Sequence, residues 1–145
     1  MGAVMPGDLF VKARQGETLH TFADRIASLF DLPSIERRES SNYMDEEYFT
    51  GTALSIAVTF ARTDDADLVD YDFWIHLRPT GAWVEDRSFV DGLADVLARR
   101  LTIAGESVVR LPNAERKGGT KIFYTLNRGA PNASREQVGT REAEA

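Results

Sequence analysis

Three residues that can do chemistry alternate along one short segment of the sequence. In YDFWIHLR, Trp74, His76 and Arg78 occupy every second position. A strand places such residues on one face of a sheet, so an aromatic ring, an imidazole and a cation are expected side by side. The imidazole could act as a general base, and Arg78 could hold an anionic group. The sequence places no nucleophile beside them, so an enzyme or a small-molecule site on this face is an alternative rather than the leading interpretation.

An acidic cluster precedes this segment, and its carboxylates are the ligand type that calcium and magnesium prefer. Its members are Asp64, Asp65, Asp67, Asp70 and Asp72. The cluster lacks the central glycine and the distal glutamate of an EF-hand loop, so a solvated turn is favoured. The segment ERKGGTK likewise lacks the glycine spacing of a Walker A phosphate loop. We therefore predict neither a metal nor a cofactor.

Composition narrows the class of partner. The chain has 145 residues, a length typical of one domain, and no cysteine, which removes disulfides and thiol catalysis. Its net charge of −6 disfavours contact with phosphate backbones, so we expect no nucleic-acid partner and favour a basic protein. No segment has the apolar length of a membrane span, and the N-terminus lacks the pattern of a secretory signal. We therefore expect a cytoplasmic protein without a membrane partner.

The elements that must position these residues follow from hydrophobic periodicity. Apolar residues at helical spacing predict helices over about 18–30 and about 88–104. Alternation in TALSIAVTFAR and YDFWIHLR predicts two half-buried strands, and SVVRL and TKIFYTL are typical of two closing strands. Short turns favour antiparallel pairing. The predicted fold is α+β, with a single mostly antiparallel sheet of about 4–6 strands and two helices packed on one face.

The two ends of the chain are predicted to contribute little to this fold. The predicted domain covers residues 1–127 and has a flexible start over 1–8, after which Leu9–Ala13 forms a short strand or an extended arm. From residue 128 onward the sequence has almost no large apolar side chain. Residues 128–145 are therefore predicted to form a disordered C-terminal tail.

A candidate binding surface combines one strand face with a polar connection. If the larger side chains of 54–60 pack on the helices, Ala57 and Thr59 form a floor of small residues beside Trp74, unless the N-terminal arm or the C-terminal tail covers it. Tryptophan and arginine are enriched at binding hot spots. The connection ERRESSNYMDEEYF adds charged and aromatic residues at the sheet rim, although an ordinary charged edge strand has the same composition. The candidate partner-binding residues are Arg37, Arg38, Tyr43, Asp45, Glu46, Glu47, Trp74, His76 and Arg78.

One local resemblance concerns the first predicted helix and the residues before it. The segment FVKARQGETLHTFADRI contains a matching set of residues, namely Gly16, Glu17, Thr18, Leu19, Phe22 and Ala23. It resembles the opening of a lysin-motif (LysM) domain, and this resemblance would imply glycan binding. The second helix and closing strand of such a module should follow soon afterwards, but ERRESSNY and further acidic residues occupy that place. No family pattern covers the chain as a whole.

The lack of a catalytic set favours a non-enzymatic protein-binding domain. Small, acidic, cysteine-free α+β chains include immunity proteins and antitoxins, which neutralise a basic toxin by occluding it, and we expect a function of this type by analogy of size and charge. One alternative is a small-molecule binding domain or enzyme that uses the face of Trp74, His76 and Arg78. Another is a structural or accessory subunit, which a large self-complementary apolar patch would support. The protein could also form a homo-oligomer.

Overall fold

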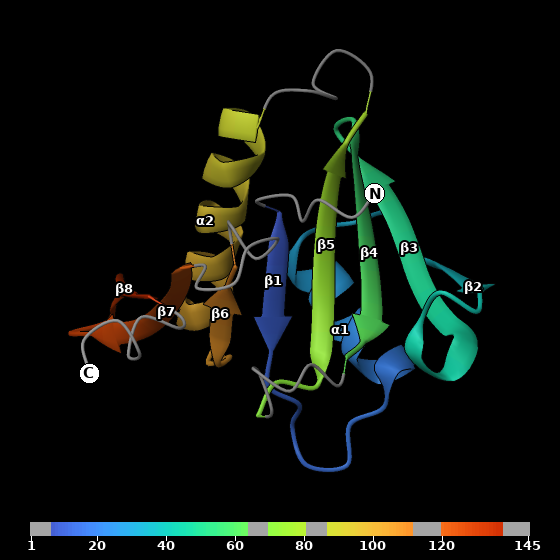
Figure 1. Cartoon of the computed structure of the whole chain (residues 1–145), viewed down its shortest axis with the longest axis horizontal. Helices are drawn as coiled ribbons and strands as arrows, with labels where there is room; N and C mark the ends of the chain where they lie inside the picture. Colours follow the sequence, from blue (N-terminus) through green and yellow to red (C-terminus); the bar gives the residue numbers. More distant parts are fainter. Residues whose placement is uncertain (1–6, 64–69, 81–86, 112–119, 138–145) are drawn as a thin grey trace.

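A computed structural model describes residues 7–63, 70–80, 87–111 and 120–137, and the described strands form one antiparallel sheet (Figure 1). The strands are β1 (Asp8–Val11), β2 (Glu36–Glu39), β3 (Glu47–Ala53), β4 (Ile56–Arg62), β5 (Phe73–Pro79), β6 (Val108–Arg110), β7 (Thr120–Asn127) and β8 (Ala130–Gln137). The helices are α1 (Leu19–Leu29), α2 (Arg87–Ile103) and the short 3-10 helix η1 (Met44–Glu46).

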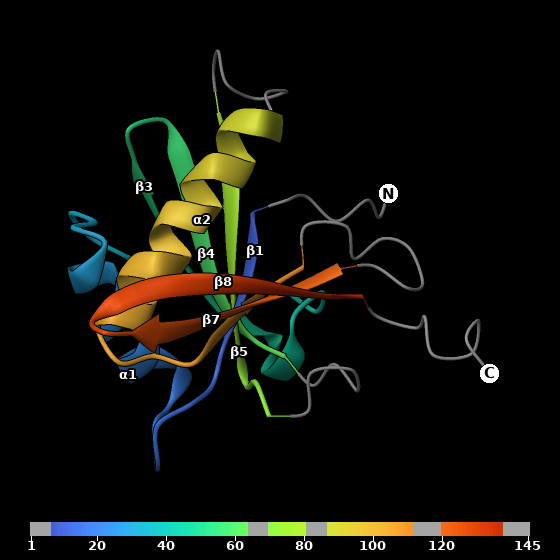
Figure 2. The same cartoon turned by 90° about the vertical axis from the view of Figure 1, so that its left-hand side faces the viewer.

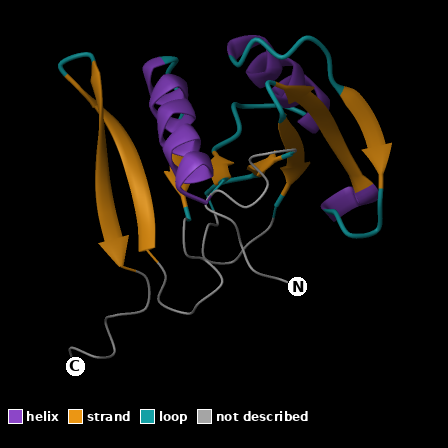
Figure 3. Cartoon of the chain, turned by 90° about the horizontal axis from the view of Figure 1, so that it is seen from above, coloured by secondary structure: helices purple, strands orange, loops and turns teal. Residues whose placement is uncertain are grey.

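Strand β1 lies in the middle of the sheet. The strand order is β2-β3-β4-β5-β1-β6-β7-β8, so β1 pairs with β5 on one side and with β6 on the other. Helices α1 and α2 lie on the same face of the sheet, as Figure 3 shows from above, and residues of both helices belong to one buried core cluster with residues of the strands. The predicted α+β class, the antiparallel sheet and the two helices on one face are confirmed.

Helix α1 begins with reciprocal capping and buries an aromatic side chain against the sheet. The Thr18 hydroxyl accepts a hydrogen bond from the Thr21 backbone N–H, and the Thr21 hydroxyl accepts one from the Thr18 N–H. One turn further on, the Phe22 ring stacks on Phe73 at a centroid distance of 4.2 Å and meets Phe60 edge-on at 6.2 Å. These contacts place α1 over β4 and β5.

Buried polar groups hold α2 to the other half of the sheet. The Arg110 side chain of β6 is only 2% exposed and pairs with Asp91 of α2. It also donates to the Tyr124 hydroxyl at 3.3 Å, and this hydroxyl donates to Asp95 at 2.8 Å. Burial raises the pKa of Tyr124 to about 12, so the phenol stays protonated and can donate at neutral pH. Because a buried charge is costly without partners, this cluster specifies where α2 packs.

The sheet has eight strands rather than the predicted four to six. Two of the unpredicted strands, β2 and β8, are the first and last in the sheet order, and neither shows the alternation of large apolar residues that marks a half-buried strand. The side chains of β2 are exposed throughout. At a sheet edge, backbone hydrogen bonds to one neighbour are enough to make a strand, and such bonds leave no signal in the side-chain pattern.

The predicted disordered tail over 128–145 is wrong for Ala130–Gln137, which pairs with β7 along its whole length (Figure 2). A two-residue turn at Arg128 and Gly129, with φ values of 55° and 79°, closes this hairpin. The predicted flexible start over 1–8 is also wrong for Gly7 and Asp8, which are buried. Residues 1–6 and 138–145 lie outside the described residues.

The close approach of the β1 start to β5 predicts that Gly7→Ala destabilises the fold. A Cβ atom at Gly7 would lie 2.5 Å from the Leu77 carbonyl oxygen and 2.9 Å from Val90 Cγ1. We expect a loss of about 1–3 kcal/mol in the free energy of unfolding, measured by denaturant titration. The matched control is Gly92→Ala in α2, where a Cβ meets nothing within 4 Å. It should gain about 0.5–1 kcal/mol, and equal effects of the two substitutions would contradict the packing at Gly7.

Candidate functional site

The candidate site lies on the helix-free face, by which we mean the face of the sheet opposite α1 and α2. On β5, the side chains of Phe73, Ile75 and Leu77 are at most 1% exposed and belong to the core under the helices. Side chains alternate along a strand, so Trp74, His76 and Arg78 stand on the helix-free face, as the sequence predicts.

A cross-strand row crosses this face from one sheet edge to the other. Residues directly opposite each other on neighbouring strands point to the same side, so the pairings define which side chains are neighbours. The row contains one residue from each strand: Arg38, Tyr48, Ala61, Trp74, Phe10, Val109, Phe123 and Ser134. Between its two polar ends the row contains four aromatic rings, of Tyr48, Trp74, Phe10 and Phe123, so the middle of the helix-free face is largely apolar.

Tyr43 lies over the smallest position of this row. Ala61 stands between Tyr48 and Trp74 in the register and is fully buried. The Tyr43 ring stacks on Tyr48 at 4.3 Å and approaches Trp74 to 6.1 Å between centroids, so it covers the space above the alanine methyl group. Tyr43 is therefore the residue through which the polar connection before β3 contacts the helix-free face.

The loop that carries Tyr43 is closed by its own backbone. The Ser40 N–H donates to the Glu46 carbonyl at 3.1 Å, and the Glu46 N–H donates to the Tyr43 carbonyl at 2.9 Å. Burial raises the pKa of the Tyr43 phenol; the neighbouring Tyr48 adds to the rise, and the charge of Arg78 opposes it. The phenol is therefore a neutral hydrogen-bonding group at physiological pH, within electrostatic range of Arg78.

Asp8 is the site residue that sequence reasoning missed. It lies directly opposite His76 in the pairing of β1 with β5 and is 4% exposed. Its Oδ1 atom accepts a hydrogen bond from Trp74 Nε1 at 3.0 Å and lies 2.5 Å from His76 Nδ1. A buried carboxylate is costly unless donors surround it, and here one oxygen fixes two ring side chains at once. The only sequence signal was a single acidic residue directly before an apolar strand.

Next to the cross-strand row, the helix-free face becomes polar. The register places Thr50, Thr59, His76 and Asp8 side by side on successive strands, and the row beyond them contains Thr52, Ala57 and Arg78. The Arg78 side chain is exposed and forms no ion pair with any other described residue. Along β5, the helix-free face is therefore aromatic at Trp74, carries hydroxyl and imidazole groups at the level of His76, and is cationic at Arg78.

The predicted rim residues divide between the two faces of the sheet. Arg38 lies opposite Tyr48, on the helix-free face, and pairs with Glu36 at 2.7 Å. Arg37 lies opposite the buried Phe49, on the helix side, where it pairs with Glu47 at 2.6 Å and with Glu39 at 3.0 Å. Asp45 lies 3.5 Å from Arg62. Of the predicted set, the helix-free face therefore brings together Arg38, Tyr43, Trp74, His76 and Arg78.

The other sequence features contribute less to the site. Within the acidic cluster, 64–67 lie outside the described residues, and Asp72 Oδ2 accepts a hydrogen bond from the Ala13 N–H at 3.4 Å. The segment ERKGGTK also falls mostly outside the described residues. Among the residues that are described, no group of three or more His, Asp or Glu side chains is arranged to hold a metal ion.

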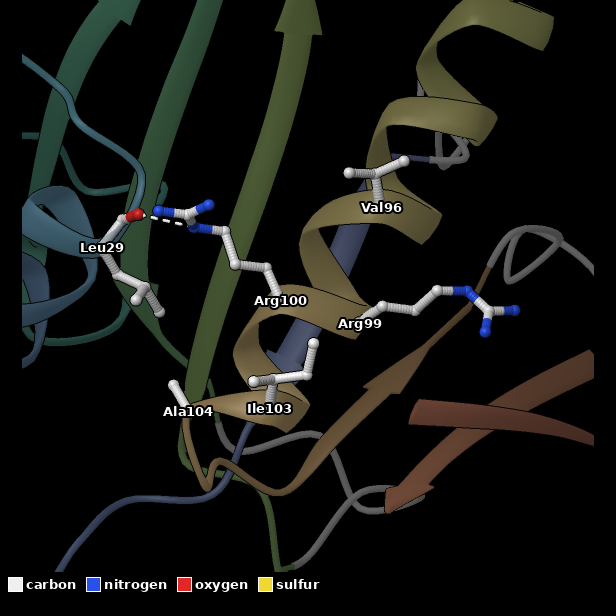
Figure 4. Close-up of a pocket in the computed structure, with 6 residues that line it drawn as sticks. All are labelled: Leu29, Val96, Arg99, Arg100, Ile103 and Ala104. Carbon is white, nitrogen blue, oxygen red and sulfur yellow. Dashed lines mark hydrogen bonds between the residues drawn. The ribbon is translucent and has the colours of Figure 1, made fainter. Parts of the chain in front are cut away.

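A second surface feature is a groove on the helix side of the molecule (Figure 4). Its lining residues are Leu29, Val96, Arg99, Arg100, Ile103 and Ala104. The two arginines already have partners, because Arg100 Nε donates to the Leu29 carbonyl at 2.8 Å and Arg99 Nε donates to Asp95 at 2.8 Å. The groove thus offers exposed apolar side chains, Val96 and Ile103, with cations that are committed to intramolecular contacts.

Comparison of the chain with protein-family models, with curated proteins and with solved structures gave no significant match. The functional argument therefore depends on the geometry of the site. Among the described helices, none has the length and apolar character that crossing a bilayer requires.

The shared oxygen of Asp8 predicts energetic coupling between Asp8 and Trp74. Trp74→Phe removes the indole donor, and Asp8→Ala removes the acceptor. Each should lower the free energy of unfolding by about 1.5–3 kcal/mol, the range for hydrogen bonds to charged groups. A double-mutant cycle by denaturant titration should give a coupling of at least about 0.5 kcal/mol. Arg78→Gln, at an exposed position, serves as the control and should change stability by less than about 0.5 kcal/mol. Additive effects of the two substitutions would contradict the hydrogen bond.

Proposed function

We propose that this chain is a non-enzymatic protein-binding domain whose contact surface is the helix-free face. The observation that carries the proposal is the aromatic group of Tyr43, Tyr48 and Trp74, which is partly exposed and held by ring contacts at 4.3 Å and 6.1 Å. Aromatic side chains contribute much of the binding energy at protein interfaces, and polar or charged residues commonly surround them.

Preorganisation supports this proposal. Trp74 is held by its hydrogen bond to Asp8 and by the Phe10 ring, which lies nearly parallel to it at 6.5 Å. Tyr43 is held by a closed backbone loop. Side chains that are already fixed lose little conformational entropy when a partner docks, so more of the contact energy remains as affinity.

We propose that this binding neutralises the partner by occluding it, in the way that immunity proteins and antitoxins act. The net charge of −6 supports a partner that is basic around the contact. Two of the acidic rim residues are engaged within the chain, Asp45 with Arg62 and Glu47 with Arg37. Glu46 has no ion pair among the described residues and is exposed, so it is the rim carboxylate best placed to attract a cation.

The aromatic contact can be tested by affinity capture from the native host with the chain as bait. We expect the original chain to capture one protein in stoichiometric amount. The amount captured should fall by roughly tenfold or more with Tyr43→Ala. The control is Ile103→Ser, which alters an exposed apolar residue on the opposite face and should leave capture unchanged. Circular dichroism melts establish that both variants are folded. Capture that survives Tyr43→Ala but is lost with Ile103→Ser would move the contact surface to the helix side.

Electrostatic steering at the rim can be tested on the captured partner by stopped-flow or surface plasmon resonance. Glu46→Lys should slow association and reduce its dependence on salt, while the dissociation rate changes little. Asp24→Lys is the matched charge reversal on α1, on the other face, and should have a smaller effect on the association rate. Equal effects of the two substitutions would show that only the overall charge of the chain matters.

A further inference from the structure

His76 is held in one orientation and in one tautomer by Asp8. The same Asp8 oxygen accepts from Trp74 Nε1, which can only donate, and lies 2.5 Å from His76 Nδ1. A carboxylate oxygen has no proton to offer, so Nδ1 must carry the hydrogen of the neutral ring. The other ring nitrogen, Nε2, then presents a lone pair. No described residue forms a hydrogen bond with Nε2, and the side chain is 22% exposed.

Three different recognition groups follow each other along β5. Trp74, together with Tyr43, supplies an apolar aromatic surface. In its neutral form His76 supplies a fixed hydrogen-bond acceptor, and Arg78 supplies an exposed guanidinium without an ion partner among the described residues. Neighbouring side chains on one face of a strand stand about 6.5–7 Å apart. The Arg78 side chain is long, so its guanidinium group can bend towards the His76 ring and lie closer to it than this spacing.

A ligand that uses all three groups needs an apolar side chain, an N–H donor and an anion in close succession. The last residue of a polypeptide has this combination, because its backbone N–H and its terminal carboxylate belong to the same residue. An internal backbone segment lacks the anion. Arginine binds carboxylates through two parallel hydrogen bonds, so a terminal carboxylate suits Arg78 particularly well.

We infer that the helix-free face binds the C-terminal residue of a partner chain. Its carboxylate contacts Arg78, its backbone N–H donates to His76 Nε2, and its apolar side chain packs on Trp74 and Tyr43. This inference rests on the proposed binding function of the same face and specifies the partner segment. A basic partner is compatible with it, because only the terminal residue needs to be anionic.

The inference is tested with small probes in two-dimensional ¹H–¹⁵N NMR titrations. The probe with all three groups is N-acetyl-L-phenylalanine. N-acetyl-L-phenylalanine amide lacks the carboxylate, 3-phenylpropionate lacks the amide N–H, and N-acetylglycine lacks the ring. The readout is the Trp74 indole resonance, recorded in a Trp83→Phe background so that one indole signal remains. We expect the complete probe to shift this resonance and each incomplete probe to bind at least roughly tenfold more weakly, the loss of one good contact.

Variants of the chain assign each contact. Arg78→Gln should remove the preference for the acid over the amide, whereas Lys12→Gln, which removes another exposed cation, should preserve it. Imidazole ¹⁵N spectra should show the hydrogen of neutral His76 on Nδ1 and a bare Nε2. Asp8→Asn tests the positioning role of Asp8. It should reduce the fraction of His76 that carries its hydrogen on Nδ1 and weaken the binding of the complete probe.

Several outcomes would overturn the inference. The first is equal binding of N-acetyl-L-phenylalanine and its amide, or a preference for the acid that survives Arg78→Gln. The second is a hydrogen on Nε2 of neutral His76. The third is displacement of the probe by inorganic phosphate at similar concentration, which would mark a general anion site. None of these outcomes removes the proposed protein-binding function if Tyr43→Ala still reduces capture of the partner as expected above. Loss of that dependence would instead remove the proposed function itself.

Discussion

The pairing of β1 with two neighbours at once is the constraint on which the rest of the structure depends. Strands β2 to β5 form one half of the sheet and β6 to β8 the other, and β1 is the strand that joins them. Each helix is fixed mainly to one half of the sheet. Helix α1 is fixed by Phe22 over β4 and β5, and α2 is fixed by the contacts of Asp91 and Asp95 with Arg110 of β6 and Tyr124 of β7. Without β1, the two halves would each expose an unpaired edge and lose their common core.

The same strand also organises the candidate site. Asp8 enters the sheet as the first residue of β1, and its carboxylate orients Trp74 and His76 on β5. Phe10, two positions later, lies beside Trp74 in the cross-strand row. Fold and site therefore share one element, and a change that displaces β1 would disturb both. A carboxylate inside the sheet is a cost to stability that the two ring donors offset, which is typical of groups that serve positioning rather than packing.

The sequence predicted the parts of the fold where large apolar residues alternate or recur at helical spacing. Strands β4 and β5 and the two helices were found in this way, and the helix-free placement of Trp74, His76 and Arg78 followed from the period of the strand. Asp8 could not be predicted as a site residue, because its partners lie 66 and 68 positions away along the chain. Arg37 and Arg38 looked equivalent in the sequence. In a strand, however, adjacent residues face opposite sides, and only the register decides which side each one takes.

Strand β2 carries a further consequence for how the molecule associates. It forms one edge of the sheet, next to the aromatic surface, and its two arginines form ion pairs with Glu36, Glu39 and Glu47. A strand from another molecule that added to this edge would have to align with four charged residues and displace these pairs. The edge therefore resists sheet extension and amyloid-like stacking, although the adjoining face is apolar. This end of the sheet therefore combines an apolar face with an edge that is closed to strand addition.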